Sequence, residues 1–134
     1  MDSRDEELLR KTIAESEGIR ANVLFYGEDL DLDRFRQIVR ECLVCSVEEI
    51  DGQDEFTETQ WNAIISRAER GCLLVTTEGK GGKLLKDRVR NGVNGLCYRD
   101  DDRSPFVLLA AKVCAPSKLD GYIVSKFGIR RELR

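Results

Sequence analysis

Residues 72–83 read CLLVTTEGKGGK, an apolar run that stops at a loop with three glycines and two lysines. The apolar part has the length of a buried strand, and a helical pattern begins at Leu84. In open α/β sheets, ligands bind beyond the carboxyl ends of the strands, where glycine lets backbone N–H groups approach an anion. This stretch therefore predicts the fold class and also a place of ligand contact.

Strand-like and helix-like segments alternate along most of the chain. The patterns predict strands at 21–27, 45–50, 72–77, 95–99 and 106–113, and helices at 3–17, 31–43, 57–70, 83–91 and 116–127. Such alternation is typical of a three-layer α/β domain with a mostly parallel sheet and helices on both faces. The run at 106–113 is almost entirely apolar, which favours a central strand. We expect the last two strands to form an antiparallel edge or hairpin near the C-terminus.

The length of 134 residues is typical of one domain. We expect three parts: a polar N-terminal helix or arm at 1–18, an α/β core domain at 19–129, and a frayed basic C-terminal tail at 130–134. Asp31 or Asp33 is expected to cap the second helix, and Thr57 the third. Each of these helices carries apolar residues at helical spacing on one face.

Composition excludes several classes of protein. No apolar run approaches the roughly 20 residues that a membrane helix needs, and the acidic start lacks a signal-peptide pattern. The five cysteines are an odd number, which favours a reducing compartment, and we expect an intracellular protein of the cytoplasm or nucleus. Histidine is absent, so Ser-His-Asp, Cys-His and histidine-ligated metal sites are excluded within this chain.

The glycine-lysine loop is the main candidate site. Its glycines can present backbone N–H groups, and its lysines add positive charge at a helix N-terminus. A short basic helix follows, so the predicted anion-binding residues are Gly79, Lys80, Gly81, Gly82, Lys83, Arg88 and Arg90. The loop lacks the spacing and the Lys-Ser/Thr pair of a Walker A motif. The alternative is a flexible surface loop that happens to be basic.

Acidic residues follow the first predicted strand. Asp29 and Asp31 could hold Mg²⁺ beside a phosphate substrate if this strand shares an edge with the glycine-lysine loop. The alternative is capping of the next helix and a favourable interaction with its dipole. Cys42 and Cys45 have redox-motif spacing but fall at a helix C-terminus, where the dipole does not favour a thiolate, so we interpret them as core residues.

Two short stretches resemble parts of known families, although no family accounts for the whole chain. Residues 77–98 resemble the phosphate-binding half of a BRCT-type domain, from which the helix at 57–70 departs. The alternation up to Thr77 is similar to receiver or TIR-type folds, but the strand at 73–77 lacks a phosphoacceptor aspartate. These resemblances imply an α/β fold and carry little functional weight.

We therefore expect an interaction domain that is non-catalytic, needs no cofactor, and binds a phosphate-bearing group on a protein partner or on nucleic acid, away from membranes. The first alternative is a small Mg²⁺-dependent enzyme that acts on a phosphorylated small molecule or nucleotide. The second is a structural subunit whose acidic stretch (28–58) and basic stretch (67–90) assemble with neighbouring subunits.

Overall fold

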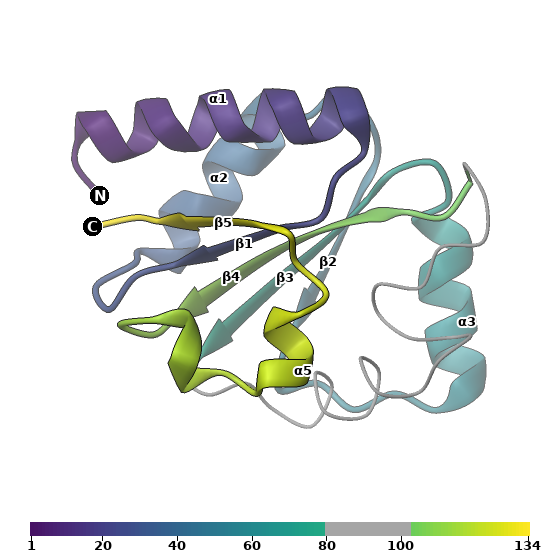
Figure 1. The fold of residues 1–134 in the computed structure, drawn as a ribbon. Coiled ribbons are helices and arrows are strands. Elements are labelled where there is room, and N and C mark those ends of the chain that lie inside the picture. Colours follow the sequence, from purple (N-terminus) through teal and green to yellow (C-terminus); the bar gives the residue numbers. More distant parts are fainter. Residues whose placement is uncertain (80–102) are drawn as a thin grey trace.

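The computed structural model describes residues 1–79 and 103–134. The five described strands form one sheet (Figure 1): β1 (Val23–Tyr26), β2 (Val47–Asp51), β3 (Cys72–Glu78), β4 (Phe106–Lys112) and β5 (Ile129–Glu132). Their order across the sheet is β2-β3-β4-β1-β5, and all four pairings are parallel. The predicted α/β class with a parallel sheet is confirmed.

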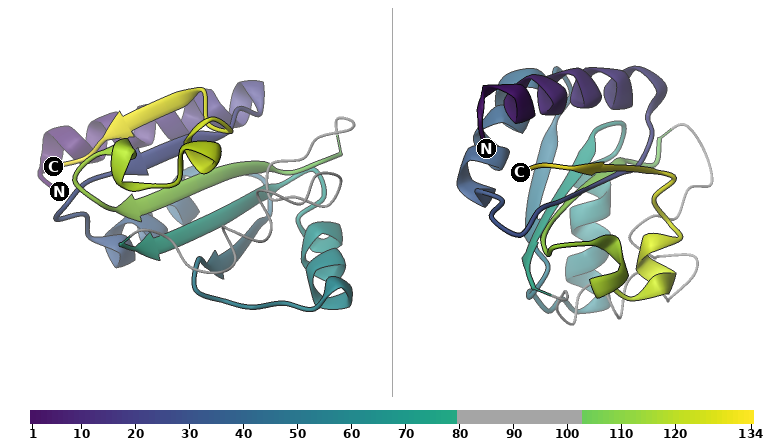
Figure 2. Two further views of the ribbon diagram at one scale, coloured as in Figure 1. Left: turned by 60° about the horizontal axis from the view of Figure 1, so that its bottom comes forward. Right: turned by 60° about the vertical axis from the view of Figure 1, so that its left-hand side comes forward.

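Helices cover both faces of this sheet. The helices α1 (Ser3–Ile19) and α2 (Leu32–Cys42) lie on one face, and α3 (Glu58–Arg67) and α5 (Gly121–Val124) on the other, with a 3-10 turn at Pro116–Lys118 before α5 (Figures 1 and 2). Each face has its own apolar core, because successive strand residues point to opposite sides. Phe25, Phe35 and Leu74 belong to the first core, and Trp61, Leu73 and Phe127 to the second.

Helices α2 and α3 begin at capping residues that the sequence predicted. The Asp31 carboxylate accepts a hydrogen bond from the Arg34 N–H at 3.0 Å and begins α2. At α3, Thr57 and Gln60 satisfy each other's backbone N–H groups in a capping box. The third helix ends at Arg67 rather than Arg70, since Arg70 adopts a left-handed backbone with φ 61°.

The last two predicted strands, 95–99 and 106–113, were expected to form an antiparallel edge or hairpin. For the second of them, which is β4, this expectation is wrong. This strand lies between β3 and β1, and both neighbours run parallel to it, so neither of its edges is open to a hairpin partner. The strand near the C-terminus is β5, which pairs in parallel with β1 at the edge of the sheet. The strand predicted at 95–99 and the helix predicted at 83–91 lie outside the described residues.

The expected fraying of residues 130–134 is also wrong. Most of β5 falls there, and the Leu133 side chain is fully buried in the core beneath α1 and α2. The Leu133 N–H donates to the Tyr26 carbonyl at 2.8 Å and so continues the pairing with β1. The domain boundaries at 18 and 129 stay a prediction, although Leu9 and Ile13 of α1 are buried in that same core.

Candidate functional site

A pocket of about 540 Å³ lies at the carboxyl edge of the sheet. Four segments supply its walls: the turn after β1 with the start of α2, the turn after β2, the end of β3, and the end of β4. The lining residues are Asp29, Leu30, Asp31, Leu32, Asp33, Arg36, Asp51, Gln53, Thr76, Thr77, Glu78 and Lys112. The parallel sheet explains the convergence, since it brings the carboxyl ends of all these strands to one edge.

The connections from β1 and β4 explain why the edge is hollow there. From β1 the chain passes through α2 on one face, and from β4 it passes through α5 on the other (Figure 2). Neighbouring strands whose connections leave toward opposite faces form a topological switch point, which is the usual ligand crevice of an open α/β sheet. The pocket occupies that position.

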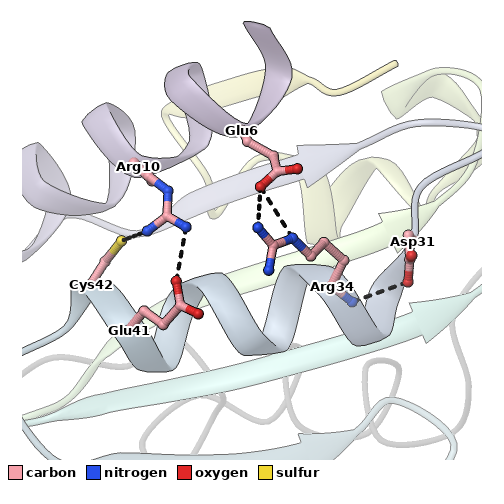
Figure 3. A network of polar contacts seen from close by, with 6 residues as sticks. All are labelled: Glu6, Arg10, Asp31, Arg34, Glu41 and Cys42. Carbon is pink, nitrogen blue, oxygen red and sulfur yellow. Dashed lines mark hydrogen bonds and ion pairs between the residues drawn. The ribbon is translucent and has the colours of Figure 1, made fainter. Parts of the chain in front are cut away.

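The protein's own carboxylate occupies the N-terminus of α2 at one wall of the pocket. Asp31 accepts the Arg34 N–H, and the Arg34 guanidinium donates to the Glu6 carboxylate of α1, with Nε at 3.1 Å (Figure 3). A helix N-terminus usually offers free N–H groups to an anion. Here the Asp31 carboxylate takes one of those donors, and Asp29 and Asp33 add negative charge beside it.

Arg36 is engaged with neighbouring side chains. Its guanidinium donates to Asp33 Oδ1 at 2.7 Å and to Thr76 Oγ1 at 2.7 Å, so it ties α2 to the end of β3. Arg36 and Lys112 are the basic residues of the described lining, which also holds the acids Asp29, Asp31, Asp33, Asp51 and Glu78. Five acids against two bases make the lining negative overall.

The opposite wall is a close contact between the turn after β2 and the end of β3. The Gly52 N–H donates to the Thr76 carbonyl at 2.8 Å, and a β-carbon on Gly52 would stand 2.9 Å from the Thr77 β-carbon. Glycine is therefore needed at position 52. Thr77 is 1% exposed, and its hydroxyl makes no hydrogen bond in the described part of the chain.

The structure brings together some of the predicted site residues. Asp29 and Asp31 line the pocket, as does Glu78, which directly precedes the glycine-lysine loop. Gly79 lies just past β3, exposed and left-handed at φ 73°, and a β-carbon at this position would meet no described atom within 4 Å. Lys80, Gly81, Gly82, Lys83, Arg88 and Arg90 lie outside the described residues. Among residues 1–79 and 103–134, no three acidic or cysteine side chains form a group that could hold a metal ion.

Sequence reasoning missed Thr76 and Thr77, which lie near the carboxyl end of β3, as well as Arg36 and Gln53. A signal for the threonines was available, because Thr76 and Thr77 are polar residues at the carboxyl end of an otherwise apolar strand. No sequence pattern distinguished Arg36, which reaches the pocket only because α2 packs across β3 and β4.

The described cysteines do not form disulfides. Cys72 is buried, Cys42 and Cys45 are half-buried against the core beneath α1 and α2, and Cys114 is exposed. Burial, and then the neighbouring Glu17 carboxylate, raises the pKa of Cys45 to about 11. Cys42 and Cys45 were expected to be core residues, whereas the structure places both half-buried at the edge of that core.

No known family and no curated protein matches the chain. Solved structures of RuvB from Thermotoga maritima do match in fold. A RuvB variant superposes with a TM-score of 0.67 at 20% identity, over 100% of this chain and 46% of that one. The RuvB Holliday junction branch migration motor matches with a TM-score of 0.62 at 19% identity, over 99% of this chain and 45% of the other.

This similarity establishes the fold at the level of an α/β domain. The chain spans less than half the length of the RuvB chains that it matches.

The strand order distinguishes this chain from the receiver fold. In the receiver fold β1 lies between β2 and β3, whereas here β1 lies between β4 and β5. In the described ranges, no helix is long and apolar enough to cross a membrane.

Proposed function

We propose that this chain is a non-catalytic interaction domain that holds a macromolecular partner at the carboxyl edge of its sheet. The turn between β1 and α2 is the observation that supports this most directly. Phosphate-binding turns at this position place glycine N–H groups and a lysine around the anion. Residues 27–33 here read GEDLDLD, and Asp31 caps the helix itself.

The charge of the pocket also disfavours direct phosphate binding. A phosphate placed among Asp29, Asp33 and Glu78 would lie near like charges in a partly enclosed space, which costs free energy. Anionic groups are better accommodated outside the pocket. We assign them to the predicted glycine-lysine loop, residues 79–83, with Arg88 and Arg90. The position of Gly79 at the carboxyl end of β3 supports this assignment.

The anion site is tested by charge reversal. Lys80→Glu with Lys83→Glu should weaken binding of a fluorescent phosphopeptide or a short oligonucleotide by about tenfold or more, measured by anisotropy. The matched control is Lys11→Glu with Lys118→Glu, two exposed lysines outside the loop, which applies the same change in net charge. Equal losses in both double variants, or no loss in the first, would remove the site.

The main alternative is the Mg²⁺-dependent enzyme, and one observation favours it. Asp29, Asp31 and the end of β3 share one pocket, as such an enzyme requires. A thermal-shift titration with ATP, with and without Mg²⁺, separates the two functions. The enzyme is supported if the thermal midpoint rises only when Mg²⁺ and ATP are present together, and if this rise is abolished in Asp29→Asn. The non-catalytic domain predicts no such rise.

A further inference from the structure

We propose that copies of this chain associate edge to edge, with β5 of one copy pairing with β2 of the next. The inference goes beyond the proposed function, because it concerns the two lateral edges of the sheet and not its carboxyl edge. These edges lie at opposite ends of the sheet (Figure 1). Two independent observations carry the inference: backbone groups at both edges that pair with no described residue, and charges of opposite sign on the two edges.

The edge at β2 has unpaired backbone groups in the middle of the strand. The Cys72 N–H donates to the Ser46 carbonyl at 2.9 Å, so the even-numbered residues of this segment face β3. The odd-numbered residues Val47, Glu49 and Asp51 therefore point their backbone groups away from the sheet. The turn after the strand satisfies both groups of Asp51, at 3.1 and 3.0 Å. No described residue pairs with those of Val47 and Glu49.

The edge at β5 is open in the same way. The Leu133 N–H donates to the Tyr26 carbonyl, so the odd-numbered residues face β1, and Arg130 and Glu132 point outward. Their N–H groups have no partner in the described structure, and the Arg130 carbonyl accepts the guanidinium of its neighbour Arg131 at 2.9 Å. An edge strand with unpaired N–H and C=O groups is a template for pairing with another chain.

The two edges carry opposite charges. Glu48 and Glu49 belong to β2, whereas Arg130 and Arg131 belong to β5. Each glutamate is bound within the chain through its Oε1 atom, so its Oε2 atom can accept a further guanidinium. Each arginine likewise keeps N–H groups that make no hydrogen bond among the described residues. Two copies of the same edge repel each other and unlike edges attract, so charge selects head-to-tail pairing.

One parallel register satisfies the backbone and the charges together. In a parallel pair, a residue that faces the neighbouring strand lies beside one that faces away, as Tyr26 does beside Glu132 in this sheet. A shift of two residues in one direction would bring Glu48 beside Glu132, where like charges repel, and a shift in the other would leave both glutamates without an arginine. The register that remains places Val47 beside Ile129, Glu48 beside Arg130, and Glu49 beside Arg131.

The test measures the weight-average mass by sedimentation equilibrium as the protein concentration increases. At about 50 mM NaCl we expect the mass to rise past that of a dimer, because a head-to-tail contact leaves an edge open on each end of the assembly. The rise should shrink at about 500 mM NaCl, since the paired charges are partly exposed. A protein that stays monomeric at millimolar concentration overturns the inference, as does a dimer that grows no further.

Charge reversal separates edge pairing from other kinds of association. Glu48→Lys with Glu49→Lys makes both edges basic. Arg130→Glu with Arg131→Glu makes both edges acidic. Each double variant alone should associate at least about tenfold more weakly than the wild type. An equimolar mixture of the two should recover the wild-type mass, because every basic edge then has an acidic partner, and this recovery also shows that both variants are folded.

Matched controls make the same changes in net charge outside both edge strands. Glu7→Lys with Glu15→Lys changes two exposed positions of α1. Lys11→Glu with Lys118→Glu makes the opposite change, also at exposed positions. Both controls should associate within about twofold of the wild type. Equal losses in the control and edge variants, or a mixture of edge variants that stays monomeric, would overturn the inference.

Amide hydrogen exchange locates the contact. The parallel register supplies acceptors to three outward N–H groups, those of Glu49, Arg130 and Glu132. These amides should exchange rapidly in dilute protein and at least about tenfold more slowly in the assembly. Protection already present in the dilute monomer would show that the edges are covered within one chain, and would overturn the inference. Protection confined to other residues in the assembly would do the same. The proposed function is tested separately, at the carboxyl edge.

Discussion

The backbone carbonyl of Leu133 lies in the space that a β-carbon on Gly27 would need. Gly27 directly follows β1 and precedes the turn that lines the pocket, and Leu133 directly follows β5, so one contact joins the C-terminal strand to the start of that turn. The contact is between backbone atoms, which cannot rotate away as a side chain can.

Gly27→Ala should therefore destabilise the protein by about 1–3 kcal/mol, because Leu133 and β5 must shift to accept the methyl group. Urea denaturation measures the loss. Gly18→Ala is the matched control, since its new β-carbon would meet nothing within 4 Å among the described residues and the position falls inside α1. That substitution should instead stabilise by about 0.5–1 kcal/mol. Equal effects of the two would contradict the close contact.

Glu17 joins α1 to the segment after α2, and the junction should depend on pH. Its carboxylate accepts the N–H groups of Val44 and Cys45 at 3.0 and 2.9 Å. Burial raises the pKa of Glu17, but these hydrogen bonds outweigh it and leave the pKa below its ordinary value. A carboxyl group with a lowered folded-state pKa stabilises the protein above its unfolded pKa, and this contribution disappears as the pH falls through the folded pKa.

Glu17→Gln should cost about 1 kcal/mol at pH 7. The difference from wild type should shrink as the pH falls below about 4.3, the ordinary glutamate pKa. Chemical denaturation at several pH values checks both statements. Glu15→Gln, an exposed residue of the same helix, should show neither effect. A Glu17→Gln cost that persists unchanged at pH 3 would contradict the assigned role of the carboxylate.

Thiol reactivity should follow the environments of the cysteines. Cys114 is exposed, whereas burial raises the pKa values of Cys45 and Cys72, that of Cys45 to about 11. The thiolate is the reactive form, so iodoacetamide at pH 8 should modify Cys114 about a hundredfold faster than Cys45. Peptide mass mapping over time measures the rates. Glu17→Gln should speed the reaction of Cys45, and comparable rates at Cys45 and Cys114 in wild type would refute the prediction.

The capping box at the start of α3 should be worth about 1 kcal/mol. Thr57→Ala removes the acceptor of the Gln60 N–H, which stands at 3.1 Å from the threonine oxygen. Thr57→Ser keeps that acceptor and should retain most of the stability in the same denaturation assay. If both variants lose equally, the methyl group of Thr57 and not its hydroxyl stabilises this end of the helix.

The helix faces and caps were predictable because they depend on local spacing. The spacing of Phe35, Ile38 and Val39 placed them on the buried side of α2, and Asp31 capped that helix as expected. The central position of β4 followed from its continuous apolar run. The predicted hairpin was wrong because strands that follow each other in sequence need not pair in the sheet. The predicted frayed tail was wrong because Leu133, the one apolar residue among four charged ones at 130–134, is buried in the core.

The sequence by itself determined the α/β class, the parallel character of the sheet and the acidic turn after β1, because these depend on periodicity and on residue type over a few turns. Tertiary structure alone decided that β1 lies between β4 and β5, and hence that Asp29, Asp51 and Thr77 line one pocket. The reason is that strand order depends on long-range burial of both sheet faces at once, which no local pattern records.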